Sequence, residues 1–487
     1  MDKYLLGLDV GTTGTKAILF SVSGEVVAQA YQGYPTQMPQ VEFREQNPED
    51  WWQAVCQVTK AVCAGKEEKV AALSLSTQGG TMVAVDKEMK PLRPAIVWND
   101  VRAEEECREF LEQVGPADLM YRKTGWELHP SASSANVRWI RKHQPEIFEK
   151  LAMYLSVPDY MALKMTGRPA VDISNVGINR FADIQKAEYD AALLAFSGLH
   201  AQQLAEIVPS GTFLGRLTEK AAKEMGLTTN TAVVSGAHDQ YAVALGAGAY
   251  NAGDILIGSG TCWVVTGIGD QPAFETGLAQ SVAAVPGQWG SLCSLPSGGI
   301  CLEWLRKNFG NDIPYEQINK ETAVRKAAEE GLFFYPFSGF AENDKQFTRG
   351  SFLGLDLSHD TFHLTRAVME GVVFQIVGIL EKFPAEFQPK ELILSGGASK
   401  SPVWSQILAD IADLPVRIPE TADLGCVGAA ILAGVGSGIY TSAEAGYESL
   451  AVKSRLVMPD PDRVAKYAPL KRQYAENAVR LTQIYKL

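Results

Sequence analysis

The sequence lacks the features that mark secreted, zinc-binding and membrane-spanning proteins. Its seven cysteines are an odd, scattered set without a CxxC pair, so neither a disulfide framework nor a zinc site is predicted. The longest apolar stretch, residues 426–435, is far shorter than the roughly 20 residues that a membrane span needs. Asp2 and Lys3 precede a strand that Asp9 interrupts, which is unlike a signal peptide. We therefore expect a cytoplasmic protein that does not bind membranes.

The chain also lacks an excess of positive charge and two common nucleotide-binding motifs. Its 44 basic and 56 acidic residues give a net charge of -12, which argues against nucleic acid or an anionic membrane as a partner. No GxxxxGK[ST] motif occurs and no complete GxGxxG follows a strand, so neither a P-loop nor a Rossmann site is expected. With 487 residues, 46% of them hydrophobic, the chain is long enough for two domains of similar size.

What the sequence does contain, near its start, is a hairpin pattern that suits a phosphate: LLGLDVGTTGTKAILF. Two apolar runs flank a turn whose glycines let backbone N–H groups approach an anion, while threonine hydroxyls and a lysine add donors. The candidate phosphate ligands are Gly11, Thr12, Thr13 and Lys16, and Asp9 offers a hard oxygen for a divalent cation. The alternative is an ordinary hairpin whose aspartate caps its own turn.

A second hairpin of the same outline follows far along the chain. An apolar strand at residues 254–257 leads into the turn Gly258, Ser259, Gly260 and Thr261, and residues 263–266 form the return strand. Alone, this would be a routine Gly-Ser hairpin. Because two phosphate hairpins occur, we expect a duplicated α/β fold in which two related domains clamp a nucleotide, as in the actin-like ATPases.

Three further residues are candidates for a role in function. Asp239 follows a strand at residues 232–235 and opens a helix, where it could deprotonate an acceptor hydroxyl or simply be an N-cap. His238 is either a substrate contact or a hydrogen-bonded structural imidazole. Gln78 follows the strand at residues 70–75, and open α/β sheets bind ligands at such strand ends.

The stretch WND places Asn99 and Asp100 as candidate substrate contacts, with a simple turn as the alternative. Later, a strand at residues 391–394 meets Gly396, Gly397 and Ala398 and then a long helix. A Gly-Gly-Ala turn lets a base or ribose approach the backbone, so it is a candidate adenosine site.

Together these motifs make the chain similar to the FGGY carbohydrate kinases. LDVGTTGTKAILF resembles the first phosphate motif of that family, GSGTCW the second, LSGGASKSPVW the adenosine motif, and HDQYAVALGAG the segment with the general base. GSFLGLDLSHDTFHLTRAVMEG resembles the late family signature. The resemblance implies a two-domain actin-like (ribonuclease H-like) ATPase fold with a duplicated core and an interdomain cleft. The expected domains are residues 1–245, with the sugar site, first phosphate motif and base, and residues 246–487, with the second phosphate motif and adenosine site.

The resemblance further implies transfer of the γ-phosphoryl group of ATP to a sugar or polyol hydroxyl, with Mg2+ as cofactor. In that chemistry Asp239 accepts the hydroxyl proton, Asp9 holds the metal through water, and the two glycine-threonine turns bind the phosphates. Lys16 is either a point charge for the phosphates or a surface lysine. Family members often form dimers, so a homodimer is a further expectation.

The substrate is less well defined by the sequence. WNDVRA and the general layout are similar to xylulokinases, which favours a pentulose such as xylulose. Gly79 and Gly80 stand where xylulokinases carry a Met-His pair, and glycerol kinases an Arg-Glu pair, so these glycines suggest an enlarged sugar pocket. His238 before Asp239 is similar to fuculose and rhamnulose kinases, which leaves a 6-deoxyhexulose or a polyol as the alternative. A non-catalytic ATP-binding sensor and a sugar-independent ATPase are competing hypotheses.

Overall fold

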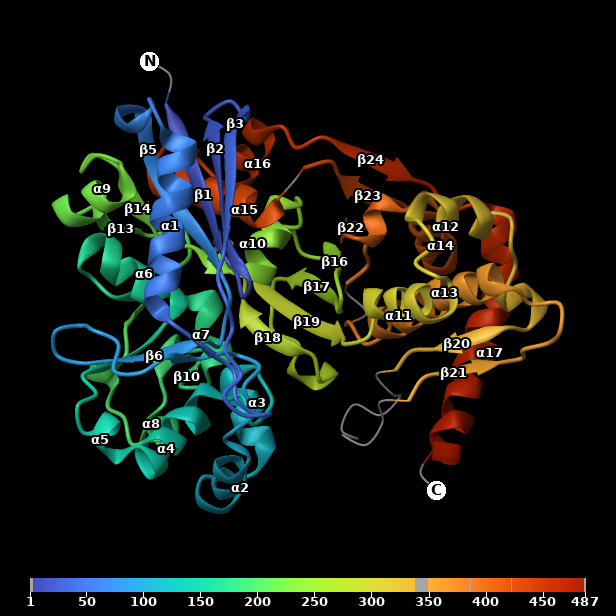
Figure 1. The fold of residues 1–487 in the computed structure, drawn as a ribbon, viewed down its shortest axis with the longest axis horizontal. Coiled ribbons are helices and arrows are strands. Elements are labelled where there is room, and N and C mark those ends of the chain that lie inside the picture. The colour runs from blue at the N-terminus through green and yellow to red at the C-terminus, as the bar shows by residue number, and fades with distance from the viewer. Residues whose placement is uncertain (1–2, 338–348, 385–386, 422, 486–487) are drawn as a thin grey trace. The chain divides into compact units, whose positions relative to one another are not determined.

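The fold is described from a computed structural model, over residues 3–337, 349–384, 387–421 and 423–485 (Figure 1). Contacts divide the chain into two compact units. The first unit contains Met1–Tyr250, Ile268–Ser291 and Thr421–Val452. The second unit contains Asn251–Gly267, Leu292–Glu420 and Lys453–Leu487. The units are therefore discontinuous in sequence, whereas the sequence predicted contiguous domains at 1–245 and 246–487.

The first unit is built on a mixed sheet with strand order β13-β14-β5-β1-β2-β3. Strands β1, β2 and β3 pair antiparallel, β5 runs parallel to β1, and β14 and the short β15 run parallel to β5. This arrangement confirms the first predicted hairpin and the predicted strands near residues 70–75 and 232–235. The strands are β1 (Tyr4–Val10), β2 (Gly14–Ser21), β3 (Val26–Gly33), β5 (Val70–Thr77), β13 (Phe213–Arg216), β14 (Ala232–Val234) and β15 (Ala237–His238).

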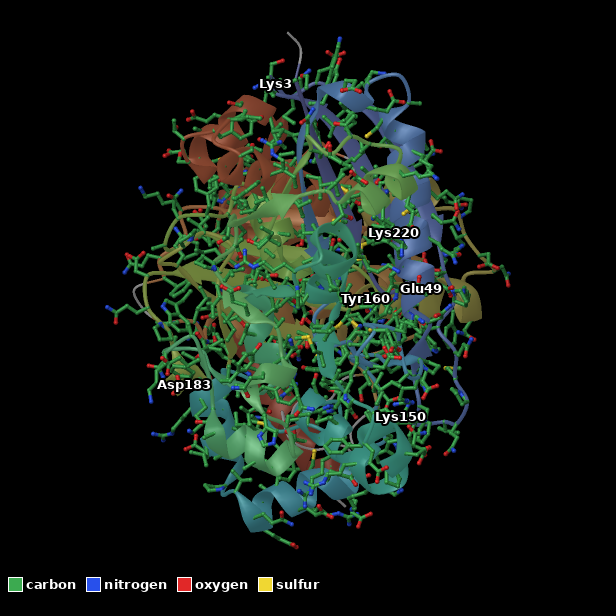
Figure 2. All side chains as sticks on the ribbon, turned by 90° about the vertical axis from the view of Figure 1, so that its left-hand side faces the viewer. Lys3, Glu49, Lys150, Tyr160, Asp183 and Lys220 are labelled. Atoms are coloured by element: carbon green, nitrogen blue, oxygen red, sulfur yellow. The ribbon has the colours of Figure 1, made fainter. Side chains whose placement is uncertain are left out.

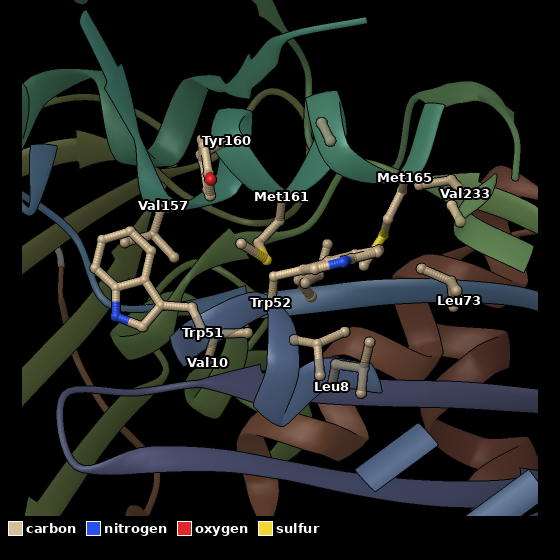
Figure 3. Packing of buried hydrophobic residues seen from close by; sticks show 14 of the residues in the cluster. Leu8, Val10, Trp51, Trp52, Leu73, Val157, Tyr160, Met161, Met165 and Val233 are labelled. Atoms are coloured by element: carbon tan, nitrogen blue, oxygen red, sulfur yellow. The ribbon is translucent and has the colours of Figure 1, made fainter. Parts of the chain in front are cut away.

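Helices α1 (Pro48–Cys63) and α6 (Val157–Thr166) pack against the core of this sheet. Helix α1 begins where the Asn47 side chain accepts the Glu49 N–H, and its first residue is a proline. Figure 3 shows Trp52 of α1 beside Met161 and Met165 of α6. The Tyr160 hydroxyl donates to the Glu49 carboxylate at 2.7 Å, and these two labelled residues lie close together in Figure 2. Buried aromatic area therefore fixes α1 and α6 on the sheet that carries the first turn.

Helix α15 (Leu424–Gly436) joins the first unit although it comes late in the chain. Its residues are apolar on all sides and almost all of them are buried, so the helix needs neighbours all around it. In Figure 1 it lies, in red-brown, with α16 (Ala443–Leu450) beside the blue strands β1 and β2. The contact is backbone to backbone: a Cβ at Gly7 of β1 would lie 2.0 Å from the Cys426 carbonyl oxygen.

The other side of α15 packs equally closely against α10 (Asp239–Gly246). A Cβ at Gly428 would lie 2.0 Å from the Ala242 carbonyl oxygen, and one at Gly246 would lie 2.0 Å from that of Leu424. The remaining elements of the unit include a small sheet of order β4-β7-β6-β8. They are β4 (Glu45–Gln46), β6 (Met82–Val85), β7 (Ala95–Ile96), β8 (Met153–Ser156), β9 (Ala170–Asp172), β10 (Ala182–Asp183), β11 (Glu188–Tyr189), β12 (Glu206–Val208), β18 (Ala279–Val282), α2 (Glu104–Gln113), α3 (Ala117–Thr124), α4 (Ser133–His143), α5 (Pro145–Phe148), α7 (Ile173–Asn179), α8 (Ala191–Ser197) and α9 (Glu219–Met225).

The second unit repeats the hairpin plan. Strands β16 and β17 pair antiparallel, and β22 runs parallel to β16, which confirms the second predicted hairpin and the strand before the Gly-Gly-Ala turn. The strand order of this sheet is β18-β19-β17-β16-β22-β23-β24. The elements are β16 (Ile255–Ser259), β17 (Trp263–Gly269), β19 (Trp289–Leu295), β20 (Phe333–Tyr335), β21 (Ser351–Leu353), β22 (Leu392–Gly396), β23 (Val416–Pro419), β24 (Ser454–Val457), α11 (Gly299–Phe309), α12 (Tyr315–Thr322), α13 (Thr361–Leu380), α14 (Pro402–Ala412) and α17 (Pro461–Tyr485).

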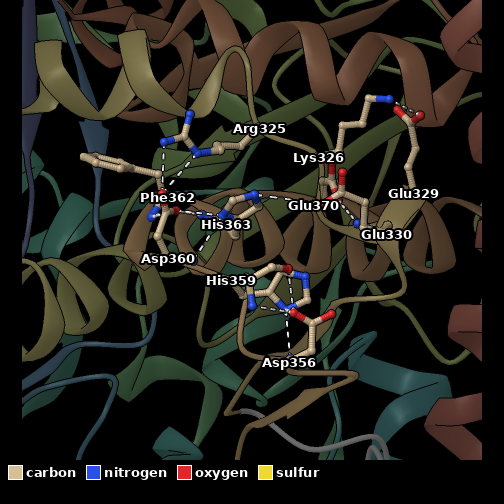
Figure 4. A network of polar contacts seen from close by, with 12 residues as sticks. Arg325, Lys326, Glu329, Glu330, Asp356, His359, Asp360, Phe362, His363 and Glu370 are labelled. Carbon is tan, nitrogen blue, oxygen red and sulfur yellow. Dashed lines mark hydrogen bonds and ion pairs between the residues drawn. The ribbon is translucent and has the colours of Figure 1, made fainter.

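Helix α13 forms the centre of the second unit. Asp360 caps its start by accepting the N–H groups of Phe362 and His363, and Arg325 forms an ion pair with the same carboxylate at 2.9 Å (Figure 4). Among the described residues it is the helix that is long and apolar enough to cross a membrane, by length and composition only. Most of the helix is buried within the unit, and it carries the Arg366–Glu370 ion pair, both typical of a core helix.

The backbone contact between α15 and α10 leads to a stability prediction. Gly428→Ala would place a methyl group against the Ala242 carbonyl oxygen, so we expect a loss of at least about 2 kcal/mol in the free energy of unfolding. The control is Gly378→Ala in α13, where a Cβ meets no atom within 4 Å, and there alanine should be neutral or stabilising by up to about 1 kcal/mol. Urea denaturation measures both. Equal midpoints for the two variants would contradict the close packing of α15.

Candidate functional site

The first phosphate turn is a tight, well-supported loop between β1 and β2. The strands pair up to Val10 and Thr15, and the Gly11 N–H donates to the Gly14 carbonyl at 3.1 Å. Thr13 lies exposed at the tip, whereas Thr12 is half-buried and its hydroxyl accepts the Trp98 indole N–H at 3.0 Å. The backbone of this turn is thus held in place while its tip stays open to solvent.

The Gln78 side chain holds this turn in place through hydrogen bonds. Its amide oxygen accepts from the hydroxyls of Thr12 at 3.3 Å and Thr81 at 3.1 Å, and its amide nitrogen donates to the Gly11 carbonyl at 3.3 Å and to Gln46 at 3.2 Å. The side chain is 2% exposed. The sequence placed Gln78 among the substrate contacts, and in the structure its hydrogen bonds all go to protein groups around the phosphate turn.

Asp9 lies on β1 and does not cap the turn. One of its carboxylate oxygens accepts the Ser76 hydroxyl from the neighbouring strand β5 at 2.7 Å. Burial, and next the negative charge of Asp423, raise the pKa of Asp9 to about 7, while the hydrogen bond from Ser76 lowers it. Asp239 adds to the same repulsion. The site therefore gathers more negative charge than it neutralises, which suits a bound cation.

Lys16 faces a partner that the sequence reasoning missed. Its ammonium group lies 2.5 Å from the Asp423 carboxylate, and the lysine side chain is 47% exposed. Asp423 also caps α15 by accepting the Cys426 N–H. Nothing in the sequence tied the segment around Asp423 to the first hairpin.

Asp239 is the first residue of α10, and the N-cap position belongs to His238. The alternative that Asp239 is an N-cap is therefore wrong. Its side chain is 33% exposed, and its carboxylate lies 3.5 Å from the His238 imidazole nitrogen Nε2. His238 is buried, and its backbone N–H donates to the Ser174 hydroxyl at 2.8 Å. Asp239 is thus a partly exposed carboxylate at a strand end beside a fixed imidazole.

The space beside Gly79 is not empty. A Cβ at Gly79 would lie 2.4 Å from the His238 ring and 2.9 Å from the Ile178 side chain. Gly80 has φ +72°, and a Cβ there would lie 3.2 Å from Trp98. The suggestion that the two glycines simply enlarge the pocket is therefore wrong at Gly79, because the His238 imidazole fills the volume that the missing side chain leaves.

Asn99 and Asp100 have different surroundings. Asp100 is fully buried, and its carboxylate accepts from the Arg44 N–H at 2.5 Å and from the Arg102 guanidinium at 2.7 and 2.8 Å. Arg102 also contacts Glu45, so these charges form a closed structural network. Such contacts are those of a structural turn, the alternative that the sequence left open. Asn99 is exposed.

The second phosphate turn lies in the second unit, against the Gly-Gly-Ala turn. Gly260 and Thr261 are exposed, and Ser259 is buried between the two turns. The Gly397 N–H donates to the Ser259 carbonyl at 2.6 Å, and the Ala398 N–H donates to the Ser259 hydroxyl at 3.0 Å. Gly396 has φ +89°, and a Cβ there would lie 2.6 Å from the Ser259 carbonyl oxygen, so this position requires glycine.

A cavity of about 500 Å³ opens between these two turns. Of the residues predicted for nucleotide binding, the lining includes Ser259, Gly260, Thr261, Gly397 and Ala398; Gly258 and Gly396 lie directly beside them in the chain. The volume and the mixture of rings and polar groups are those of a site for a small organic ligand. The lining residues that sequence reasoning missed include Trp263, Tyr315, Trp404, Glu303, Asn319 and Lys400.

Comparisons with known proteins identify the family of the chain. Residues 4–246 match the N-terminal domain of the FGGY family of carbohydrate kinases, and residues 212–437 match its C-terminal domain. A gluconokinase of Bacillus subtilis is 30% identical over 448 residues, covering 89% of this chain and 87% of the relative. A xylulose kinase of Escherichia coli is 30% identical over 480 residues, covering 96% and 97%.

A solved structure supports the fold. The xylulose kinase of Rhodospirillum rubrum superposes with a TM-score of 0.92 at 27% identity, covering all of both chains. The predicted two-domain α/β fold of the actin-like ATPases is therefore confirmed. The two family models match most of the sequence of this chain. The chain therefore belongs to the FGGY family of carbohydrate kinases.

Proposed function

We propose that this kinase transfers the γ-phosphoryl group of ATP to a hydroxyl of an open-chain sugar, with Asp239 as general base. A ketose, with a pentulose such as xylulose first, is the acceptor class that the sequence favours. The observation that carries the proposal is the position of Asp239: a partly exposed carboxylate at a strand end, not used as a cap, in the same unit as the Asp9 turn. Xylulose kinases and a gluconokinase among the relatives support this substrate range.

The chemistry assigned to Asp239 is one proton transfer. As the acceptor oxygen forms its bond to the γ-phosphorus, the bond from phosphorus to the β-phosphate oxygen breaks, and the hydroxyl proton moves to the Asp239 carboxylate. His238, 3.5 Å from that carboxylate, holds its orientation and contributes a second contact for the sugar. Glycines at positions 79 and 80 leave backbone rather than side chains facing this region.

Asp9 fits a magnesium site of the kind that phosphoryl transfer uses. Among the described residues, no group of three or more His, Cys, Asp or Glu side chains could hold a metal on its own. One hard carboxylate with other acids nearby suits Mg2+, which keeps several waters and takes phosphate oxygens as further ligands. When bound, the ion neutralises charge on the phosphates. The backbone N–H groups of the first turn and the Lys16 ammonium add fixed positive charge.

The nucleotide half of the proposal rests on the second unit. The cavity beside the second turn is assigned to adenosine, and the turn Gly258, Ser259, Gly260 and Thr261 to the phosphates.

A 6-deoxyhexulose or a polyol stays an alternative acceptor because of the His-Asp pair. The expected homodimer and cytoplasmic location belong to the same proposal, and light scattering and cell fractionation would test them.

Coupled ADP release across an acceptor panel tests the function. The panel contains pentuloses, 6-deoxyhexuloses, polyols and sugar acids with magnesium and ATP, and a reaction without sugar is the control. We expect one acceptor class to exceed the others by at least about tenfold in kcat/KM. Sugar-independent ADP release would favour an ATPase, and ATP binding without any turnover would favour a sensor.

Asp239→Asn should lower kcat by at least about 100-fold, the typical contribution of a general base, while ATP affinity changes little. Asp118→Asn is the matched control, because Asp118 is an exposed first-turn aspartate of α3 in the same unit. Steady-state kinetics and nucleotide titration measure the two effects. Near-normal turnover of Asp239→Asn would remove this residue from the base role.

Asp9→Asn should weaken the magnesium dependence of turnover and change the pH dependence of stability. The pKa of Asp9 is raised from 3.8 to about 7, so the stability that protonation supplies is present below about pH 4 and is lost as the pH rises toward 7. An asparagine stays neutral. Without nucleotide or metal, the melting temperature of Asp9→Asn relative to the wild type should therefore be higher at pH 8 than at pH 4.5. A pH-independent difference and an unchanged magnesium titration would count against the assignment.

A further inference from the structure

Arg180 is a buried cation that forms no ion pair with any acidic side chain in the part of the chain that the structure describes. It follows α7 as the C-cap residue in a left-handed conformation, with φ +57°, and is 6% exposed. Its guanidinium donates from Nε to the Glu127 carbonyl at 2.8 Å and from Nη1 to the Ile178 carbonyl at 2.9 Å. These two carbonyl oxygens accept from the guanidinium but carry no full negative charge to compensate it.

The charges that act on Arg180 are few. Burial lowers its pKa to about 10, and the groups that oppose this effect are the Cys107 thiol and Glu127, whose side chain is exposed to solvent. An uncompensated charge in a buried place is costly, and so is a left-handed backbone at a residue other than glycine. The uncompensated charge points to a ligand that supplies the missing negative charge.

Arg180 lies next to the residues assigned to the sugar. The carbon at the centre of its guanidinium is 5.7 Å from the centre of the Trp126 ring, and the Trp126 ring is 6.3 Å from the His238 ring. Ile178, whose carbonyl accepts from Arg180, has its side chain 3.4 Å from where a Cβ of Gly80 would be. A chain of direct contacts thus runs from Asp239 through His238 and Trp126 to the guanidinium.

The separation of the two ends of α7 gives the length that the ligand has to span. The Ser174 hydroxyl at the start of the helix accepts the His238 N–H, and Arg180 ends the helix six residues later. At 1.5 Å per residue these backbone positions are about 9 Å apart. An extended chain advances roughly 1.2 Å per bond, so a six-carbon acid with its terminal oxygens covers about 8 Å. Such a molecule can reach from one end of α7 to the other.

We propose that the acceptor is an acyclic sugar acid whose carboxylate pairs with Arg180 while a hydroxyl at its far end faces Asp239. This inference rests on the proposed kinase function and replaces its ketose acceptor with a sugar acid. A guanidinium binds a carboxylate through two parallel hydrogen bonds, whereas a neutral polyol leaves the buried charge unpaired. The gluconokinase relative, by its name, acts on an acid of this class.

The test compares D-gluconate with D-glucitol, which share a six-carbon chain and differ at the carboxylate. The wild type should prefer gluconate in kcat/KM by at least about 100-fold, since a site built for a charged group rejects the analogue that lacks it. Arg180→Met should reduce this ratio to less than about tenfold, and Arg180→Lys should retain part of it. Arg141→Met is the matched control, because Arg141 also lies 5.7 Å from an aromatic ring, that of Phe148, and should leave the ratio unchanged.

Several outcomes would overturn the carboxylate site. A gluconate-to-glucitol ratio near one in the wild type would overturn it even if the Arg180 variants fail to fold. An equal loss of both activities in Arg180→Met would also overturn it, because a purely structural role predicts that result. Calorimetric titration of gluconate without nucleotide separates the two proposals. Binding that depends on Arg180 in a protein that phosphorylates no acceptor would refute the kinase proposal alone. Turnover of a neutral ketose without gluconate binding would refute the carboxylate site alone.

Discussion

The close backbone contact of α15 with β1 and α10 is the constraint on which the rest of the first unit depends. Glycines at positions 7, 246 and 428 allow it, because any side chain there would meet a carbonyl oxygen at 2.0 Å. Asp423 caps this helix, Asp239 is the first residue of the neighbouring helix, and Asp9 lies on β1. The packing of α15 therefore brings three carboxylates from distant parts of the sequence close enough to act on one another.

Burial and this gathering of like charge together raise the pKa of Asp9 to about 7. The Ser76 hydroxyl and the Lys16 ammonium, which also forms an ion pair with Asp423, lower it only in part. In the proposed site, a cation beside Asp9 would reduce this repulsion. The hydrogen bonds of Gln78 to Gly11 and Thr12 hold the glycine-rich turn in place.

Near Gly79, a side chain from a distant part of the sequence fills the space that the glycine leaves. This side chain is His238, so an imidazole is present here although positions 79 and 80, where xylulokinases carry a Met-His pair, are both glycine. The same histidine contacts Trp126, which in turn lies beside Arg180. Within the first unit, a ligand would thus meet the Asp239 carboxylate at one end and the buried Arg180 cation, at the end of α7, at the other.

The sequence by itself determined both hairpins, the strands before Asp239 and Gly396, and the family, because these depend on local patterns of apolar runs, glycine and turn residues. Only the tertiary structure decided that residues 421–452 belong with the N-terminal residues, that Asp423 meets Lys16, and that Gln78 and Asp100 support the protein around them. Arg180 likewise gave no signal in the sequence. Contacts between residues far apart in the chain depend on how whole elements pack, and an arginine in a sequence does not reveal whether an acid lies opposite it.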